Sequence, residues 1–336
     1  MIRSSEVIPY ALPFREPYVT SRGRLDRREL ILLRLTDADG VTGLGETTSM
    51  SLRGGRALEA IVAELRAVPL DRPLEGVRSP EARCAVATAL LDLELRRSGA
   101  PAPVAPVPVN ATLSSGPPGQ VARAAEAWAE LGFTTFKLKV GGEGDAEQAE
   151  AVREAVGDDA RIRLDANGSW SADEATRILA EVEALGIELC EQPVEGIEEM
   201  ALVRAATGIP LAADESVASP ADARRAREGG ACDLATLKLA KVGGPDAAER
   251  GEWGLPAYIS SALEGPVGIA AAARVAAAMD AAGTGAGIAH GLATQLLFAD
   301  TIAAAGPEVR DGTLVLPAGA GLGVELDPMA LERHRL

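Results

Sequence analysis

The sequence predicts an α/β protein: a barrel of the (β/α)7β kind, a variant of the (β/α)8 barrel, with an N-terminal α+β capping domain. Two observations predict this fold class. From residue 109 onward, short apolar runs alternate with helical segments, which is typical of βαβ units that build a parallel sheet. Eight such runs within about 190 residues favour a closed barrel over an open, doubly wound sheet.

The first 100 residues predict the capping domain. Two strands and two helices are expected in it: Leu30–Thr36, Val41–Glu46, Arg56–Ala67 and Ser79–Ser98. The strands are joined by Asp37-Ala38-Asp39-Gly40, which supplies turn residues. The second helix has Ser79 as its N-cap, Pro80 at its first position and Gly99 just beyond its end.

The proline-rich residues 101–108 predict an extended linker, because closely spaced prolines cannot form a helix. Residues 109–305 predict the barrel, and residues 306–336 a C-terminal segment that returns to the cap. The barrel strands are expected at Val109–Leu113, Thr135–Val140, Arg161–Ala166, Ile187–Glu191, Pro210–Asp214, Leu234–Leu239, Ala257–Ser261 and Gly285–His290. Ser171 and Glu174 form a capping box at the start of one of the intervening helices.

Charge and composition exclude several classes of function. The net charge is −16 and the pI about 4.7, so no basic stripe exists for a nucleic-acid backbone, although a small anion can still bind in a locally basic pocket. The three cysteines lack a CxxC spacing, which disfavours a disulfide framework or a zinc site. No apolar run reaches the roughly 18 residues that span a bilayer. We therefore expect a cytoplasmic protein without nucleic-acid or membrane partners; a homo-oligomer stays open.

Lysine is rare in this chain. Only four of the 33 Lys and Arg residues are lysines, and they fall in two motifs. Lys137 and Lys139 lie in Phe-Lys-Leu-Lys-Val, and Lys238 and Lys241 in Leu-Lys-Leu-Ala-Lys-Val. Arginine is effectively never deprotonated, whereas lysine can lose its proton and act as a base. Lys137 and Lys139 share one face of their strand, so the ammonium group of Lys137 favours the neutral, basic form of Lys139.

Three acids end three successive predicted strands. Asp165 lies in Leu-Asp-Ala-Asn-Gly, Glu191 in Cys-Glu-Gln-Pro and Asp214 in Ala-Asp-Glu-Ser. Neighbouring strand ends are one strand spacing apart, so these side chains can converge at the barrel mouth. Crowded carboxylates repel one another unless a cation lies between them, and all-oxygen ligation suits Mg²⁺, with Mn²⁺ as a substitute, better than zinc. Solvated loop acids are the alternative interpretation.

The two kinds of residue together predict a chemistry. The lysine motifs flank the three acids along the sequence, on the strand before them and the strand after them. A divalent cation polarises a substrate carboxylate, and a neutral lysine can then remove a proton from the adjacent carbon. The residues therefore predict removal of a proton α to the carboxylate of a small-molecule substrate.

Taken in order, Lys-x-Lys, Asp-Ala-Asn, Glu-Gln-Pro, Asp-Glu-Ser and Leu-Lys-Leu-Ala-Lys-Val-Gly-Gly resemble the motifs of the enolase superfamily, muconate-lactonizing subgroup, over nearly the whole chain. The resemblance implies that Lys139 is the base on one face of the substrate and that Lys238 lies at the opposite face. It implies three ligands for Mg²⁺: Asp165, Glu191 and Asp214. It also implies supporting residues that tune, line or brace the site: Lys137, Asn167 and Glu215.

Three segments are similar to those of the o-succinylbenzoate synthases, lyases of this superfamily that act in menaquinone biosynthesis. They are the segment with Ser260 and Ser261, the cap segment around Arg24, and His290-Gly-Leu-Ala-Thr294. The resemblance implies a syn dehydration of a cyclohexadiene carboxylate. It also implies that Ser260, Ser261 and Arg24 bind the substrate.

Other reactions stay open. The motif around Lys238 is as similar to those of cycloisomerases and epimerases, and N-acylamino acid racemization also fits; a catalytically inactive binding protein is a third class. Residues 283–287 lack the Asp-x-Asp with which dipeptide epimerases of this subgroup hold a substrate ammonium group. His290 is expected to be a wall residue of the barrel. Arg22 and Arg24 either meet a substrate carboxylate or are solvated.

Overall fold

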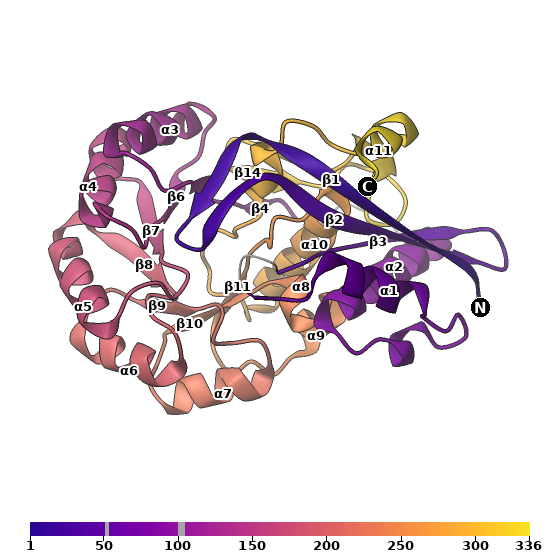
Figure 1. The fold of residues 1–336 in the computed structure, drawn as a ribbon, viewed down its shortest axis with the longest axis horizontal. Coiled ribbons are helices and arrows are strands. Elements are labelled where there is room, and N and C mark those ends of the chain that lie inside the picture. Colours follow the sequence, from indigo (N-terminus) through magenta and orange to yellow (C-terminus); the bar gives the residue numbers. More distant parts are fainter. Residues whose placement is uncertain (51–53, 100–104) are drawn as a thin grey trace.

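The computed structural model describes residues 1–50, 54–99 and 105–336, so residues 101–104 of the predicted linker lie outside the described residues. Figure 1 shows a cap next to a ring of strands surrounded by helices. The cap contains an antiparallel sheet in the order β1-β2-β3 and two α-helices. The bounds of its elements are β1 Ile2–Thr20, β2 Gly23–Asp37, β3 Thr42–Thr48, α1 Leu58–Arg66, the 3₁₀ helix η2 Pro73–Gly76, and α2 Pro80–Ser98.

The two predicted strands and two predicted helices of the cap are confirmed, and so is their local chemistry. Asp37 Oδ1 accepts hydrogen bonds of 2.9 Å from the amides of Asp39 and Val41, which fixes the turn between β2 and β3. Ser79 Oγ accepts from the amide of Ala82 at the start of α2. Gly99 ends α2 with φ at 65°, a conformation that favours glycine.

The sequence pattern did not predict β1. Its 19 residues include Pro9, Pro13 and Pro17, which lack the N–H group that the interior of a sheet needs. In the described sheet β1 pairs only with β2, so it is an edge strand, where proline is tolerated. β1 and β2 form a long hairpin whose tip lies across the mouth of the barrel (Figure 1).

The barrel sheet has seven parallel strands in the order β11-β10-β9-β8-β7-β6-β5, so each strand pairs with its neighbour along the chain. Their bounds are β5 Ala111–Leu113, β6 Thr135–Lys139, β7 Arg161–Asp165, β8 Ile187–Glu191, β9 Leu211–Ala213, β10 Leu234–Leu237 and β11 Ala257–Ile259. The helices between and after them are α3 Pro118–Glu130, α4 Asp145–Val156, α5 Ala172–Glu181, the 3₁₀ helix η3 Glu183–Leu185, α6 Ile197–Ala206, α7 Pro220–Glu228, α8 Leu239–Val242, α9 Pro245–Arg250, α10 Pro266–Ala282 and the 3₁₀ helix η4 Ala293–Leu297. Ser171 and Glu174 form the predicted capping box at α5.

The eighth predicted strand, Gly285–His290, closes the ring through isolated bridges. It pairs in parallel with β11 at Ala257 and with Val109, two residues before β5. The amide of Asn110 donates to the carbonyl of His290 over 2.9 Å, and the amide of Ala286 donates to the carbonyl of Ala257 over 2.8 Å. The segment is too rich in glycine to form a regular strand. The predicted (β/α) barrel is therefore confirmed, with one irregular member.

Inside the barrel, side chains form layers because alternate strand residues point the same way. One layer is apolar and buried, and it consists of Leu189, Ala212, Leu234 and Tyr258, packed against Ala286 and Ile288. Two residues further along their strands come polar side chains: Glu191, Asp214 and Ser260. The apolar layer is thus the floor on which a polar layer rests at the carboxyl ends of the strands.

The last residues of the described chain lie against the cap. They contain β12 Ala303–Ala305, β13 Glu308–Arg310, β14 Thr313–Val315, β15 Glu325–Leu326 and α11 Pro328–His334. β14 pairs with β4 Val107–Pro108, which lies just before the first barrel strand. The amide of Leu336 donates to the carbonyl of Pro9 over 3.0 Å, and Arg335 forms a bridge with Tyr10. The limits given above for the domains stay predictions.

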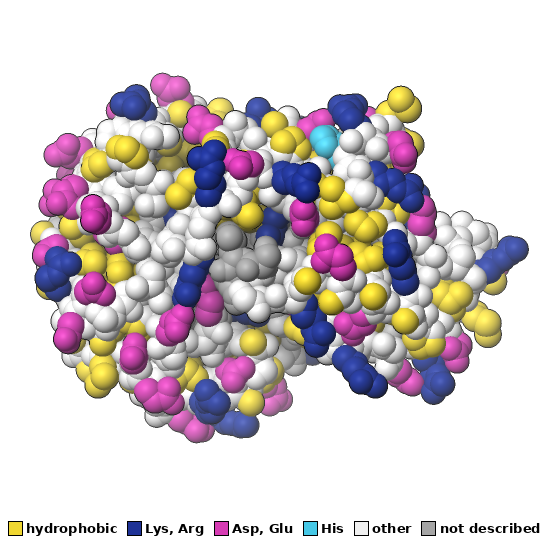
Figure 2. Space-filling view, in the orientation of Figure 1, with side chains coloured by type: hydrophobic (Ala, Val, Ile, Leu, Met, Phe, Trp, Pro, Cys, Tyr) yellow, Lys and Arg dark blue, Asp and Glu magenta, His cyan; other side chains and the backbone are white. Residues whose placement is uncertain are grey.

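Two features of the whole chain bear on its partners. No helix in residues 1–50, 54–99 and 105–336 combines the length and the apolar character needed to cross a membrane. On the face drawn in Figure 2, acidic and basic side chains are interspersed, and the described residues form no continuous basic surface there.

Candidate active site

The predicted catalytic and acidic residues lie in one row at the mouth of the barrel. Lys139, Asp165 and Glu191 end β6, β7 and β8 and are in register with one another across the three strands. Asp214 follows β9 directly, and Lys238 follows β10 directly. All five side chains are buried. The local fold therefore brings together the residues that the sequence motifs single out.

On the β6 side, two lysines share the carboxylates. Lys139 Nζ lies 2.5 Å from Asp165 Oδ2, and Lys137 Nζ lies 2.8 Å from the same oxygen and 2.6 Å from Glu191 Oε2. The pKa of Lys137 is raised well above its ordinary value: burial, the largest effect, lowers it, but the charges of Asp165 and Glu191 together outweigh burial. Lys137 therefore carries a positive charge beside Lys139 in this structure.

On the β10 side, Lys238 and Lys241 hold Asp214. Lys238 Nζ lies 2.5 Å from Asp214 Oδ2, and Lys241 Nζ lies 2.8 Å from Asp214 Oδ1. Lys241 also donates to the carbonyls of Asp214 and Thr236. Lys241 stands in the sequence motif but was not predicted as a site residue. Its spacing of three from Lys238 is the signal that could have found it.

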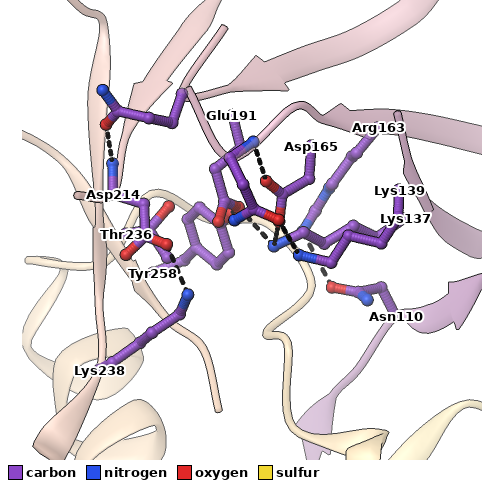
Figure 3. A network of polar contacts seen from close by, with 12 residues as sticks. Asn110, Lys137, Lys139, Arg163, Asp165, Glu191, Asp214, Thr236, Lys238 and Tyr258 are labelled. Carbon is purple, nitrogen blue, oxygen red and sulfur yellow. Dashed lines mark hydrogen bonds and ion pairs between the residues drawn. The ribbon is translucent and has the colours of Figure 1, made fainter. Parts of the chain in front are cut away.

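The two predicted catalytic lysines approach from opposite walls. In the closed ring, β6 and β10 are four positions apart in either direction, once the segment 285–291 is counted between β11 and β5. Figure 3 shows Lys137 and Lys139 entering from one side and Lys238 from the other, with Asp165 and Glu191 between them. A planar group bound between these walls presents one face to Lys139 and the other to Lys238.

Asn167 and Glu215 brace this arrangement. Asn167 Oδ1 accepts from Lys139 Nζ over 3.0 Å, and Asn167 Nδ2 donates to Glu215 Oε1 over 3.0 Å. Asn167 has φ at 49°, in the left-handed region that asparagine tolerates better than most residues. This backbone turn directs its side chain back toward Lys139.

Gln192 is a bracing residue that sequence reasoning missed. Its Oε1 accepts from the amides of Asp214 and Ser216, and its Nε2 donates to Ser216 Oγ over 2.6 Å. Gln192 thus ties the end of β8 to the loop that carries Asp214. The position of Gln192 next to Glu191 in Glu-Gln-Pro was the available signal.

The lysines open onto a cavity that is partly open to solvent. Its described lining consists of Tyr18, Thr20, Arg22, Arg28, Met50, Thr112, Lys137, Lys139, Asn167, Lys238, Ser260, Ser261, Ala262, Leu263, Gly291 and Thr294. Five of these residues are cationic, and no described residue in the lining is acidic. The cavity therefore suits an anionic ligand, as the sequence analysis allowed despite the negative net charge.

The predicted substrate-binding residues have different outcomes. Ser260 and Ser261 both line the cavity, and Ser261 Oγ also accepts from Thr294 Oγ1 over 2.7 Å. Arg24 does not line it: its guanidinium is exposed on β2 and pairs with Asp26 at 2.9 Å. Arg22, at the hairpin turn, and Arg28 line the cavity instead.

Arg22 attaches the hairpin tip to the site. Its Nε donates to the carbonyl of Asn167 over 2.9 Å, and its guanidinium pairs with Glu195 at 2.7 Å. Ser21 Oγ donates to the carbonyl of Ala166 over 3.1 Å. Arg22 is thus neither merely solvated nor free to move independently of the loop that carries Asn167.

His290 is a wall residue, as expected. Its Nδ1 accepts from the amide of Ile259 over 2.9 Å, and its Nε2 lies 3.2 Å from Asp280 Oδ2. Burial, partly opposed by Asp280, lowers the pKa of His290. A neutral ring whose Nδ1 accepts and whose Nε2 donates fits both contacts, and it closes the barrel between β11 and α10.

Polar atoms also lie at the level of the apolar layer, because Tyr258 belongs to that layer and Arg163 is in register with Leu189. The hydroxyl of Tyr258 donates to Glu191 Oε2, and burial together with the charge of Glu191 raises the pKa of Tyr258 well above its ordinary value. The fully buried Arg163 lies over the Tyr258 ring at 5.3 Å and pairs with Glu188. These contacts fix Glu191 Oε2 and leave Oε1 without a hydrogen-bond partner among the described residues.

The donor set of the three acids fits Mg²⁺ or Mn²⁺. Asp165, Glu191 and Asp214 offer only oxygen, as these cations prefer, and Glu191 Oε1 is buried with no hydrogen-bond partner among the described residues. As they stand, no three Asp, Glu, His or Cys side chains in the described part of the chain are gathered closely enough to hold a metal ion. The predicted convergence is not reached because lysine ammonium groups hold each carboxylate.

Comparisons with known proteins agree with this geometry. Residues 120–330 match the family model described as enolase C-terminal domain-like. The chain is 41% identical to the o-succinylbenzoate synthase of Thermobifida fusca over 194 residues, which cover 55% of this chain and 60% of that protein. It is 31% identical to the L-Ala-D/L-Glu epimerase of Clostridium acetobutylicum over 303 residues, which cover 80% of this chain and 84% of that protein.

Solved structures show the same fold over the whole length. The muconate lactonizing enzyme from Pseudomonas fluorescens, complexed with muconolactone, is 29% identical with a TM-score of 0.89, covering 100% of this chain and 99% of its own. The dipeptide epimerase from Cytophaga hutchinsonii, complexed with Mg and the dipeptide D-Ala-L-Val, is 27% identical with a TM-score of 0.83, covering 99% and 98%. By its sequence, its barrel and its cap, this chain belongs to the enolase superfamily.

Proposed function

We propose that this chain is a Mg²⁺-dependent lyase that removes a proton α to a substrate carboxylate and eliminates water to form o-succinylbenzoate. The observation that carries the proposal is the pair of buried lysines, Lys139 and Lys238, that line one cavity from opposite walls of the barrel. The choice among the reactions of the superfamily is supported by the 41% identity to the Thermobifida fusca synthase.

The charge of the cavity supports a substrate with two carboxylates. One carboxylate would lie near the acids and lysines at the floor, and the second near Arg22 and Arg28 of the cap. A dipeptide carries an ammonium group, which would face cationic side chains without an acidic partner in the described lining. The cavity therefore disfavours dipeptide epimerization, in line with the missing Asp-x-Asp.

In the proposed reaction Lys139 Nζ takes the proton from the carbon next to the carboxylate. Because the elimination is syn, the ammonium form of Lys139 stands on the face from which the hydroxyl group leaves and can return the proton to it as water. Lys238 stays protonated on the other face and, with Lys137, stabilises the developing negative charge. Asn167 orients Lys139 through its 3.0 Å contact.

Mg²⁺ would be held by Asp165, Glu191 and Asp214, in exchange for their present contacts with lysine ammonium groups. When bound, the cation supplies Lewis-acid stabilisation of charge on the substrate carboxylate. The Mg-containing epimerase structure of the same fold supports this assignment. Mn²⁺ has the same preference for oxygen ligands and would serve as a substitute.

The test is to incubate the protein with the cyclohexadiene carboxylate that precedes o-succinylbenzoate, with Mg²⁺ and with EDTA, and to follow the aromatic product by ultraviolet absorbance. We expect Mg²⁺-dependent formation of o-succinylbenzoate. Absence of product with a folded, Mg²⁺-loaded protein would reject the lyase.

A second candidate is an N-acylamino acid racemase, because two lysines on opposite faces can also exchange protons with one carbon. In D₂O, a racemase exchanges the α-proton of N-succinyl amino acids, and a dedicated dehydratase does not. Exchange without dehydration would favour the racemase. A cytoplasmic location and the lack of nucleic-acid partners stay predictions.

A further inference from the structure

Glu46 is a buried carboxylate that the reaction described above does not use. It lies on β3 of the cap, and its side chain is completely shielded from solvent. Its Oε1 accepts from the hydroxyl of Tyr10, and its Oε2 accepts from the amide of Gly268 over 2.5 Å. Tyr10 belongs to the cap, whereas Gly268 belongs to the first turn of the barrel helix α10. Glu46 therefore joins the two parts of the molecule.

The helix that Glu46 meets begins at a wall of the cavity. Residues 260–265 connect β11 to α10, and Ser260, Ser261, Ala262 and Leu263 line the cavity. Leu263 has φ at 67°, a left-handed conformation that costs a leucine about 1 kcal/mol or more. Such a conformation persists only when surrounding contacts impose it, so this wall depends on what holds α10 and the loop in place.

α10 has no cap of its own in the residue before it. Its N-cap is Gly265, without a side chain, whereas α2, α5 and α7 are capped by the nearby serines Ser79, Ser171 and Ser219. The first-turn amides of a helix need an acceptor, and a carboxylate there also meets the positive end of the helix dipole. Glu46, which is 222 residues away in the sequence, supplies the acceptor and the negative charge.

Two glycines make room for this contact. A Cβ on Gly265 would lie 2.4 Å from the Tyr10 hydroxyl oxygen and 2.5 Å from Glu46 Oε1. A Cβ on Gly268 would lie 2.5 Å from Glu264 Cβ and 3.1 Å from Glu46 Oε2. The barrel sequence is thus fitted to a side chain of the cap, which an accidental contact would not require.

The loop is held at two further points. The guanidinium of Arg28, on β2 of the cap, donates to the carbonyl of Ala262 over 2.8 Å and to that of Ser49 over 2.7 Å. Within the loop, Glu264 Oε2 accepts from the amide of Ala262 over 2.6 Å and from Ser261 Oγ over 2.8 Å. Arg28 therefore holds the middle of the loop, and Glu46 holds its end.

We propose that Glu46 is a positioning residue that acts from the cap: by capping α10 it fixes the strained loop 260–265 and so shapes the wall against which the substrate binds. The inference rests on the proposed function only in taking this cavity as the substrate site. It predicts that loss of the Glu46 carboxylate weakens substrate binding while the proton-transfer residues, which lie on other strands, keep their geometry.

The test compares Glu46→Gln with Glu64→Gln in the full chain. Glu64 is a matched control because it also accepts at a helix start, from the amides of Arg78 and Ser79 and from Ser79 Oγ, but it does so inside the cap and away from the cavity. Hydrogen–deuterium exchange is measured on peptides covering residues 260–270 at about pH 8, above the pKa of about 7 to which burial raises Glu46, so that the wild type carries the carboxylate. KM and kcat are measured with whichever superfamily substrate the wild type turns over.

For Glu46→Gln we expect exchange in residues 260–270 to be about tenfold faster, as for the loss of one buried hydrogen bond. We expect KM to rise about five- to tenfold with kcat within about twofold, the pattern of lost ground-state binding. Glu64→Gln should leave both quantities at wild-type values. A KM-specific change is not what general destabilisation of a folded protein produces.

The proposal is overturned if folded Glu46→Gln exchanges and binds like the wild type, or if Glu64→Gln changes the 260–270 segment equally. Should Glu46→Gln fail to fold, Tyr10→Phe removes the hydrogen bond from the Tyr10 hydroxyl to Glu46 and keeps the carboxylate. We then expect a smaller rise in loop exchange and KM, and wild-type values for both would equally reject the proposal. Exchange needs no substrate, so a failure of the proposed reaction leaves this result interpretable.

Discussion

All four lysines of the chain contact acids of the candidate site, three of them buried and Lys241 partly buried. Lys137 and Lys139 contact Asp165, and Lys238 and Lys241 contact Asp214. In this structure the charges of Asp165 and Glu191 raise the pKa of Lys137, so the proposed base lies beside a cationic group. In the proposed function Lys139 acts as a base, a role that arginine cannot fill because it stays protonated.

Lys139→Ala is expected to lower kcat by about 10²–10⁴-fold, the range for loss of a general base. Asp165 keeps Lys137 as a partner, so the fold should be retained, which circular dichroism checks. The measurement is steady-state turnover with Mg²⁺ at saturating substrate. Activity within tenfold of the wild type would remove Lys139 from the role of base.

Asp214→Ala is expected to abolish turnover, and added Mg²⁺ should not restore it, because one of three oxygen ligands is lost. Dialysis of the wild type against EDTA should abolish turnover reversibly, with recovery on adding Mg²⁺. Isothermal titration with Mg²⁺ gives the corresponding loss of affinity in the variant. Full activity of the wild type in EDTA would be incompatible with the proposed metal site.

At this scale, the sequence identified the residues whose spacing follows the strands. Lys139, Asp165 and Glu191 end consecutive strands, so periodicity alone places them in one row. The strand spacing did not identify residues whose position depends on a turn. Arg22 and Arg24 are two positions apart near the hairpin tip, and only the bend of the chain there decides which of them reaches the cavity.

Among the elements, the hairpin of β1 and β2 has the most direct contact with the site. Arg22→Ala removes the bonds to the carbonyl of Asn167 and to Glu195 and is expected to lower kcat/KM about tenfold, as for loss of a charge-assisted contact that orders a lid. Arg24→Ala is the matched control, because Arg24 is exposed and pairs with Asp26. Equal losses in the two variants would contradict the assignment of Arg22.

The contact between β3 and α10 predicts a pH effect on stability. Burial, partly opposed by hydrogen bonds from Tyr10 and Gly268, raises the pKa of Glu46 from 4.5 to about 7. Folding therefore favours the protonated form, and this contribution is present below pH 4.5 and lost as the pH rises to about 7. From pH 4.5 to 7, the wild type should lose about 3 kcal/mol of unfolding free energy relative to Glu46→Gln. Urea unfolding of both proteins across this range measures it, and a pH-independent difference would refute the shift.

Two elements show why sequence patterns reach only part of the fold. β1 carries three prolines because it is an edge strand in the described sheet, and this position is a property of the sheet rather than of β1 alone. The segment 285–291 closes the barrel although its glycines weaken any strand pattern, since the bonds that fix it come from Ala257 and Pro108 on its neighbours. Regular alternation predicted the other barrel strands well.

In the whole molecule, the barrel and the cap each contribute residues to the candidate site. The ring of strands sets Lys139 and Lys238 on opposite walls, and the cap adds Arg22 and Arg28 to the cavity and Glu46 to the start of α10. The sequence motifs predicted the residues that the barrel contributes, because each motif lies on one strand. The residues that the cap contributes depend on contacts between positions more than 140 residues apart in the sequence, and no local sequence pattern encodes such contacts.

The most direct test of the central claim is a crystal structure of the protein with Mg²⁺ and o-succinylbenzoate. We expect the Nζ atoms of Lys139 and Lys238 on opposite faces of the ring, each about 3–4 Å from the carbon that bears the carboxylate, as reacting groups must be. If both lysines lie on one face, or if either remains paired with its acid and away from the ligand, the account of two opposed lysines is wrong.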